Sequence, residues 1–148
     1  MLWKLNDDGS FSNQLAAIID WQGMHEGCMT NDLAHFLTVS IDGELRREHE
    51  DDFLRYYYDT LSKLLREEGR NVDFTFDQVK RAYNSNFVQH TITIMMAGPF
   101  FYMNGKEWSP EEKPTKEAEL EKILLRAQFA MEDALERFKE LPEEKLRD

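Results

Sequence analysis

Three long stretches with the spacing of amphipathic helices constrain the fold of this chain more than any other feature. They cover residues 44–69, 75–98 and about 115–141. Apolar side chains recur at every third or fourth position in each stretch, and this period predicts helices that bury one face in a common core. On the first long helix, the stripe expected to be buried consists of Leu45, Phe53, Tyr57, Leu61, Leu64 and Leu65.

Capping and breaking residues mark the expected helix ends. Thr30 or Asn31 can cap a short helix that contains "DLAHFL". Thr75 and Gln78 in "TFDQ" have the spacing of a capping box, so the second long helix is expected to begin there. Glycine and proline are expected to end the long helices. These residues are Gly69 for the first, Gly98 and Pro99 for the second, and Pro142 for the third.

Ahead of the helices the sequence pattern is that of strands. "MLWKL" and "LAAIIDW" are apolar segments joined by a polar loop with the turn signal Asp8-Gly9, so residues 1–22 are expected to form a β-hairpin. The second arm shows no alternation, which predicts a strand covered on both faces. Two strands alone are marginally stable in water, so the hairpin is expected to pack against another part of the protein. The predicted fold is α+β and mainly α, a single domain (1–148) with this hairpin followed by four helices in residues 23–148.

Composition and charge exclude several classes of partner. The net charge is −11, with 29 acidic against 18 basic residues. A surface of this sign repels phosphate backbones, so no nucleic-acid partner is expected. No apolar run is long enough to cross a bilayer and "MLWKLNDDGS" does not resemble a signal peptide, so we expect no membrane partner and a cytoplasmic location. Cys28 is the only cysteine, which excludes an internal disulfide.

Two aspartates flank the loop that leads from the hairpin to the first helix. Asp20 follows the apolar run "LAAII", and a carboxylate at the end of a buried strand is well placed to hold a hard cation such as Mg²⁺. The alternative is an aspartate that ends the strand and caps the next turn. Asp32 opens "DLAHFL", where an acid stabilises a helix N-terminus. The fold could bring the two acids together, but their spacing does not require it.

Other catalytic chemistries have little support in the sequence. "HEGC" offers His25, Glu26 and Cys28, but a zinc site needs four ligands and no second cluster is present. The chain contains no G-x-S-x-G, G-x-x-x-x-G-K-[ST] or G-x-G-x-x-G motif, so acyl transfer and P-loop chemistry are not indicated. The remaining histidines, each alone in a predicted helix, are His35, His49 and His90.

The joint pattern I-I-D-W-Q, D-L-A and R-R-E-H resembles one known family. It is similar to the CHK kinase-like (ecdysteroid-kinase-like) group, in particular its nematode branch, which is related to choline kinases and aminoglycoside phosphotransferases. The resemblance covers nearly the whole chain and implies a protein-kinase-like C-terminal lobe. It also implies roles for the two acids. Asp20 would hold the magnesium that bridges the ATP phosphates, and Asp32 would brace the catalytic loop through hydrogen bonds to its backbone.

The same resemblance shows which parts of such an enzyme this sequence lacks. The catalytic loop H-G-D-L-W-x-N-N does not occur in it, nor do the glycine-rich loop and the ATP-binding lysine, so this chain contains none of the family's general-base residues. The resemblance therefore implies the C-terminal fragment of an ATP-dependent kinase that phosphorylates a hydroxyl of a small metabolite. Alone, the chain is expected to be inactive and to bind neither Mg²⁺ nor ATP.

An alternative to the kinase fragment is a non-catalytic helical module that binds a partner. In either case the uncovered strand edges of the hairpin are expected to invite self-association.

Overall fold

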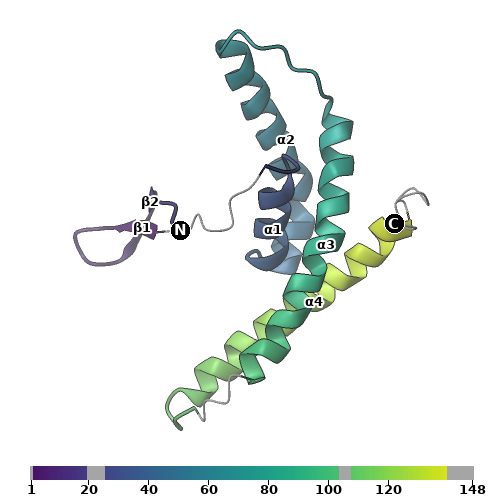
Figure 1. The fold of residues 1–148 in the computed structure, drawn as a ribbon. Helices are drawn as coiled ribbons and strands as arrows, with labels where there is room; N and C mark the ends of the chain where they lie inside the picture. The colour runs from purple at the N-terminus through teal and green to yellow at the C-terminus, as the bar shows by residue number, and fades with distance from the viewer. Residues whose placement is uncertain (1, 20–25, 104–107, 140–148) are drawn as a thin grey trace.

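The computed structural model describes residues 2–19, 26–103 and 108–139, with side chains omitted for 101–103. Its described part is mainly helical and begins with a two-stranded antiparallel hairpin, which confirms the predicted fold class (Figure 1). The elements are β1 (Leu2–Leu5), β2 (Phe11–Ala17), α1 (Asn31–Val39), α2 (Gly43–Glu67), α3 (Phe76–Met103) and α4 (Lys113–Lys139).

The hairpin has one apolar face. Trp3 pairs with Leu15 and Leu5 with Phe11 across the two strands, and cross-strand partners point to the same side of a sheet. The turn is held by Asp8, whose carboxylate accepts hydrogen bonds from the Ser10 backbone N–H and hydroxyl at 2.9 and 2.6 Å. Gly9 supplies the positive φ of 83° that this tight turn requires.

The hairpin lies apart from the helices, and its strands β1 and β2 make no contact with them (Figure 1). The prediction that β2 is covered on both faces is therefore wrong for this chain. Its strand residues are exposed except for the half-buried Ser12. β2 begins within the predicted polar loop and shares only residues 15–17 with the predicted apolar arm "LAAIIDW", and the described part of the chain contains nothing that covers it.

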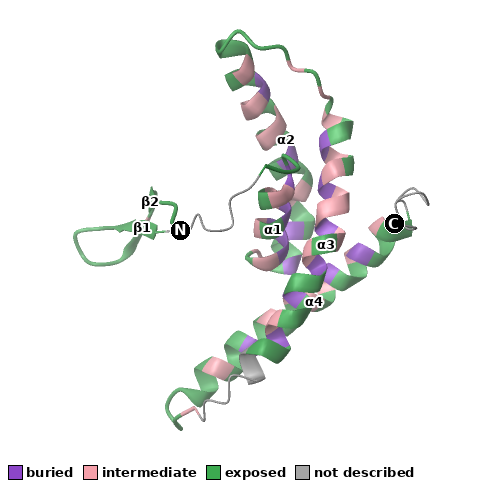
Figure 2. Cartoon of the chain, in the orientation of Figure 1, coloured by how far each residue is buried: buried purple, intermediate pink, exposed green. Residues whose placement is uncertain are grey.

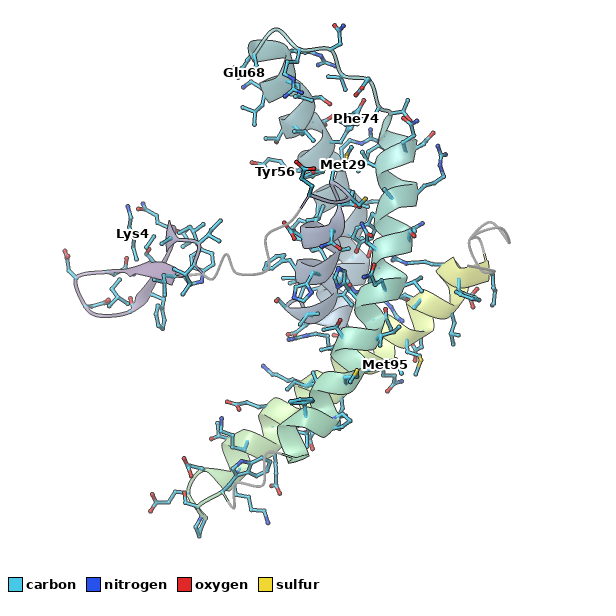
Figure 3. The ribbon with its side chains drawn as sticks, viewed as in Figure 1. Lys4, Met29, Tyr56, Glu68, Phe74 and Met95 are labelled. Atoms are coloured by element: carbon cyan, nitrogen blue, oxygen red, sulfur yellow. The ribbon has the colours of Figure 1, made fainter. Side chains whose placement is uncertain are left out.

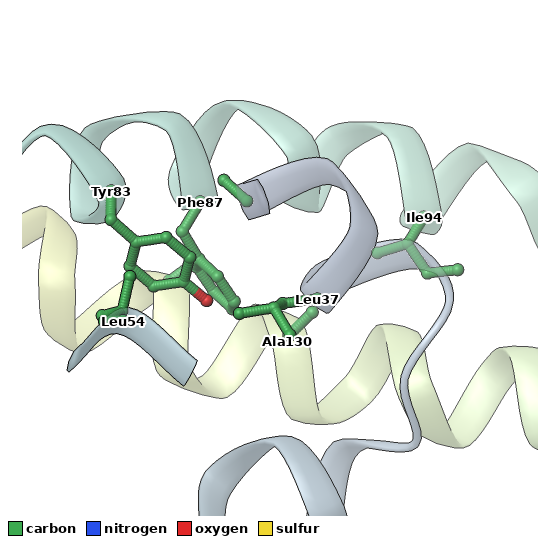
Figure 4. Packing of buried hydrophobic residues seen from close by; sticks show 8 residues of the cluster. Leu37, Leu54, Tyr83, Phe87, Ile94 and Ala130 are labelled. Atoms are coloured by element: carbon green, nitrogen blue, oxygen red, sulfur yellow. The ribbon is translucent and has the colours of Figure 1, made fainter. Parts of the chain in front are cut away.

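The core lies where α1, α3 and α4 meet, with α2 closing one side. Purple residues concentrate at this crossing in Figure 2, and Figure 4 shows their side chains interdigitating. The buried cluster comprises Ala34 and Leu37 of α1, Leu54 of α2, Tyr83, Phe87 and Ile94 of α3, and Ala130 and Ala134 of α4.

The buried face of α2 differs from the predicted stripe. Leu45 and Leu64 are 47% and 52% exposed, whereas Arg46 and Ser62 are buried. The predicted stripe was therefore wrong at Leu45, Phe53 and Leu64, which are exposed. Hydropathy favours leucine over arginine at buried positions, whereas here α2 buries Arg46. Leu54, which was not in the predicted stripe, is the buried apolar residue of α2.

α3 continues through the predicted break. The helix includes Gly98 and Pro99 and runs to Met103, so the prediction that this pair ends it was wrong. Gly98 is buried against α4, and a methyl group placed on it would lie 3.1 Å from the Leu124 side chain. Proline costs about 3 kcal/mol inside a helix, and we attribute the continuation to this packing of α3 on α4.

The starts of α3 and α4 follow side-chain caps that are visible in the sequence. Thr75 and Gln78 form the predicted capping box, with the Thr75 N–H donating to Gln78 Oε1 at 2.7 Å and the Gln78 N–H donating to Thr75 Oγ1 at 3.3 Å. Ser109 and Glu112 form a second box at the start of α4, at 3.1 and 3.3 Å, ahead of the helix start predicted at about residue 115.

The start of α2 packs tightly on α4. A Cβ atom added to Gly43 would lie 2.5 Å from the Phe129 Cβ, closer than carbon atoms can approach. Substitution of Gly43 by alanine, normally favourable in a helix, is therefore expected to destabilise the protein by about 1–3 kcal/mol, as overpacking does. Thermal unfolding followed by circular dichroism measures this. Glu44→Ala, at an exposed position in the same turn, is the control and should change the melting temperature little.

Candidate functional site

The candidate site is built around Asp32, because Asp20 lies outside the described residues together with Trp21 and His25. Asp32 stands in the first turn of α1, where side chains from α2 and α3 converge on the backbone that precedes the helix. We name this group the Thr30 cluster. Its members are Met29, Thr30, Asn31, His35, Tyr57, Asn86 and His90.

Tyr57 ties α2 to the turn before α1. Its hydroxyl donates a hydrogen bond of 2.7 Å to the Met29 carbonyl oxygen, and Met29 lies beside α2 in Figure 3. Burial raises the pKa of Tyr57, and the neighbouring Cys28 and Asp32 raise it further. The hydroxyl therefore keeps its proton and the hydrogen bond at neutral pH.

Thr30 is the buried centre of the cluster. It is completely inaccessible to solvent, and its hydroxyl accepts a hydrogen bond of 2.9 Å from the Asn86 side chain on α3. Thr30 occupies the N-cap position of α1 but makes no side-chain capping bond, so the predicted capping role is not fulfilled by its hydroxyl. The hydroxyl instead fixes the start of α1 to α3.

Two histidines, predicted to stand singly, meet in this cluster. The Nδ1 atoms of His35 and His90 lie 3.3 Å apart, and the rings pack edge to face at 81°. His90 Nε2 lies 3.1 Å from Asn31 Oδ1. An amide oxygen only accepts hydrogen bonds, so His90 donates from Nε2 and, when neutral, accepts at Nδ1 from His35. One proton therefore bridges the two rings.

The carboxylate of Asp32 is left free to contact another segment. Asp32 is exposed, and within the described part of the chain its carboxylate makes no hydrogen bond or ion pair. The backbone on either side of it is fixed, since the Ala34 N–H donates to the Thr30 carbonyl at 2.8 Å. The geometry presents a firmly positioned hydrogen-bond acceptor at the surface, unpaired among the residues that the structure describes.

A second polar group, which the sequence analysis missed, joins α2 to α3 and α4. We call it the buried charge network, and its members are Arg46, Arg47, Glu50, Tyr83, Asp133 and Arg137. Arg46 is 1% exposed and its guanidinium donates to Asp133 at 2.5 Å and to Glu50 at 3.3 Å. Arg137 donates to the other oxygen of Glu50 at 2.5 Å. The local signal was the Arg46–Glu50 spacing of four, which pairs opposite charges on one helix face.

Electrostatics within the network keep the Asp133 carboxylate charged. Burial alone would raise the pKa of Asp133, but hydrogen bonds from Arg47 and Arg46 outweigh it and hold the pKa below its usual range. Burial raises the pKa of Tyr83, as does the nearby Glu50 carboxylate. Tyr83 therefore stays protonated and donates to Glu50 at 2.7 Å.

The described residues do not assemble a metal centre. Among them, no group of three or more histidine, cysteine, aspartate or glutamate side chains is arranged to hold a metal ion. The predicted magnesium ligand, Asp20, falls outside these residues, so its role stays a prediction. Within the same residues, no helix is both long and apolar enough to cross a membrane.

Comparison with known families assigns the chain to one protein family. The family profile described as "DUF1679: Uncharacterized oxidoreductase dhs-27" matches residues 1–141. This chain therefore belongs to that family. No solved structure matches it.

Two curated proteins of Caenorhabditis elegans are similar to the chain. "Uncharacterized oxidoreductase dhs-27" is 40% identical over 94 residues, which are 62% of this chain and 12% of that protein. "Uncharacterized kinase-like protein D1044.1" is 25% identical over 136 residues, which are 90% of this chain and 34% of that protein. The chain thus spans only a minor part of the length of either relative. The second match supports a distant kinase-like relationship, and the narrower resemblance to the CHK kinase-like group stays a prediction.

The histidine pair makes the stability of the helical part sensitive to acid. Burial lowers the pKa of His90 below the ordinary value of 6.5, and His35 lowers it further. As the pH falls below 6.5, His90 takes up a proton in the unfolded chain before it does so in the folded chain. The free energy of unfolding therefore decreases. Urea unfolding of wild type at pH 7 and pH 5.5 measures the loss, which His90→Gln should reduce.

His49, which lies on the outer side of α2, supplies the control for this measurement. The variant His49→Gln should leave the difference in stability between the two pH values close to that of wild type. An equal loss in wild type and His90→Gln would contradict the assignment to His90.

The buried charge network predicts a large effect of removing a single charge. Glu50→Gln leaves two nearly buried guanidinium groups, Arg46 and Arg137, with less negative charge than they require. The expected loss is about 3 kcal/mol in the free energy of unfolding, typical of breaking a buried ion pair. Denaturant unfolding measures it, and Glu48→Gln, at an exposed neighbouring position, is the matched control. Equal stabilities of the two variants would contradict a structural role of the network.

Proposed function

We propose that this chain contributes the helical, substrate-side lobe of an ATP-dependent phosphotransferase that phosphorylates a hydroxyl of a small metabolite. The proposal is supported by the match of 25% identity to a kinase-like protein over 90% of the chain. It is also supported by the order of elements, a strand hairpin followed by helices, which the resemblance to the CHK kinase-like group implies. The activity belongs to the whole protein in which such a lobe works, and not to this chain alone.

The observation that carries the proposal is the way the structure presents Asp32. The Thr30 cluster holds the start of α1 through hydrogen bonds from Tyr57 and Asn86, yet it leaves the Asp32 carboxylate unpaired among the described residues. A residue that braces a catalytic loop needs both properties, a fixed position and free acceptor oxygens. Asp32 would accept hydrogen bonds from backbone N–H groups of that loop and so fix its conformation.

Asp20 would act as the metal ligand in this scheme. Its carboxylate supplies the hard oxygen donor that Mg²⁺ prefers, and Mg²⁺ commonly takes one or two carboxylates together with phosphate oxygens. When bound, the ion would neutralise the charge that develops on the phosphates during transfer. The other role of this chain would be to position the hydroxyl-bearing substrate. The helices from Glu44 onward would form the wall beside it.

The apolar face of the hairpin fits the same proposal. Trp3, Leu5, Phe11 and Leu15 share one face and are between 42% and 79% exposed. Exposed apolar clusters of this kind usually mark an interaction site. In a kinase-like protein, further strands and the nucleotide-binding lobe would cover this face, which would place the end of β2 at the centre of the site.

The test uses the longest in-frame transcript that encodes this chain, expressed and screened for transfer of labelled γ-phosphate from ATP to hydroxylated amines, aminoglycosides and sterols. Phosphoryl transfer depends on positioning and charge neutralisation, so Asp20→Asn should lower turnover by about 1,000-fold or more. Asp32→Asn should also lower turnover, through the loop that it braces. Asp59→Asn, at an exposed position of α2, should leave the activity unchanged.

Two outcomes would contradict the proposal. One is a folded, ATP-hydrolysing transcript product in which Asp20→Asn and Asp32→Asn both keep full activity. The other is ATP-dependent phosphorylation by the purified 148-residue chain, which would show that the chain does not depend on a separate nucleotide lobe.

A further inference from the structure

His90 of α3 spans one turn of α1. Its Nε2 lies 3.1 Å from Asn31 Oδ1, and its Nδ1 lies 3.3 Å from His35 Nδ1. Asn31 and His35 are four residues apart and so lie on the same face of α1, whose first turn also carries Asp32. The His90 ring is half-buried, whereas His35 and Asp32 are exposed. One side chain of α3 therefore contacts both ends of the turn that presents the Asp32 carboxylate.

The two contacts of His90 limit the number of protons that the histidine pair can carry. The Asn31 contact requires a proton on His90 Nε2, and the contact between the rings requires one proton between the two Nδ1 atoms. A first added proton can bind Nε2 of His35, an atom outside both contacts, and the bridge stays intact. A second added proton must bind Nδ1 of His90. Both Nδ1 atoms then carry hydrogen, so no hydrogen bond can join them.

Double protonation also places two positive charges side by side. The ring centroids are 4.8 Å apart, and like charges at this separation repel each other. Among the described residues, the titratable groups that influence the His90 ring are His35 and Asp32, both on α1. Tyr57, which α2 brings to the cluster, keeps its proton and stays neutral. The described part of α4 brings no charged group to bear on the ring. The Asp32 carboxylate is therefore the counter-charge that the described residues place beside the pair.

We propose that His35 and His90 form an acid-responsive switch that captures the Asp32 carboxylate when both rings are protonated. His35 follows Asp32 by three residues, a spacing at which opposite charges on a helix attract each other. His90 faces the same turn from α3. Loss of the bridge frees both Nδ1–H groups to donate to the carboxylate. At neutral pH the bridge occupies these two atoms, and Asp32 stays open to another segment.

Capture regulates the candidate site, and this consequence rests on the proposed function. Asp32 oxygens that accept hydrogen bonds from imidazolium groups are no longer available to the backbone N–H groups of a catalytic loop. Acid therefore lowers phosphoryl transfer by removing the brace while the helices remain folded. The environment of His90 sets the direction, since burial and His35 hold its pKa below the ordinary value of 6.5. The second proton binds only below that pH.

The first test follows both histidine rings of the purified 148-residue chain by nitrogen-15 NMR from about pH 7.5 to 5. Circular dichroism at each pH verifies that the helices remain folded. At neutral pH the His90 ring should carry its proton on Nε2. The two rings should titrate in separate steps, as coupled groups do. The resonance of the Asp32 carboxyl carbon should move with the second step, and His90→Gln should abolish this movement.

Two variants show whether the charges act on one another. His35→Gln keeps an N–H donor for His90 Nδ1 but removes one charge, so His90 should bind its proton about tenfold more tightly than in wild type. Asp32→Asn removes the counter-charge and should weaken binding of the second proton by about tenfold. Asp59→Asn, at an exposed position of α2, is the matched control and should leave both steps unchanged.

Three outcomes would overturn the proposal. They are titration of the two rings in a single step, an Asp32 resonance that does not follow the second step, and an unchanged proton affinity of His90 in His35→Gln. The second outcome would mean that the freed rings turn to solvent and leave the carboxylate uncaptured.

The second test measures phosphotransferase activity against pH in the product of the longest in-frame transcript. Wild-type turnover should fall with the midpoint of the second histidine step, and His90→Gln should lose this fall. A fall of equal midpoint in both proteins would contradict regulation by the pair. The NMR test needs no activity, so a product without phosphotransferase activity would contradict the proposed function alone, and the resonances would still decide whether the switch exists.

Discussion

The pairing of Arg46 with Asp133 and Glu50 is the interaction on which the arrangement of the helices depends. A buried guanidinium without counter-charges would cost several kcal/mol, so α2 is stable only in the position where α4 supplies Asp133 and α2 itself supplies Glu50. Arg137 closes the network from α4 and also stacks on Phe87 at 3.8 Å. Since polar partners must meet at defined distances and angles, the network fixes the orientation of α2, which apolar contacts alone would leave less specified.

The same orientation determines how the candidate site is built. α2 carries Tyr57, which binds the carbonyl oxygen of Met29, and α3 carries Asn86 and His90, which bind Thr30 and Asn31. The turn before α1 is therefore positioned by two helices whose mutual arrangement the charge network sets. A disturbance at Arg46 would be expected to reach Asp32 through this path, although the two residues do not touch.

Local signals in the sequence predicted the fold class, the hairpin and the capping box at Thr75, because each depends on residues within a few positions of one another. The features that were missed depend on partners far along the chain. The predicted buried stripe left out Arg46, because hydropathy takes no account of its counter-charge Asp133, which is 87 residues away. His35 and His90 are 55 residues apart and no periodicity links them. The break predicted at Pro99 ignored the support that α4 gives to α3. Asp20 lies outside the described residues, so its role as a metal ligand stays a prediction.

Arg126 shows how the earlier helices depend on α4, which follows them in the chain. Its guanidinium binds the Val39 carbonyl oxygen at 2.7 Å and the Asp42 carboxylate at 2.6 Å, across the corner between α1 and α2. During synthesis on the ribosome, that corner and the arginines of α2 emerge long before their partners on α4. The helical core can therefore be completed only after α4 has left the exit tunnel, and until then the nascent chain would need protection from premature aggregation.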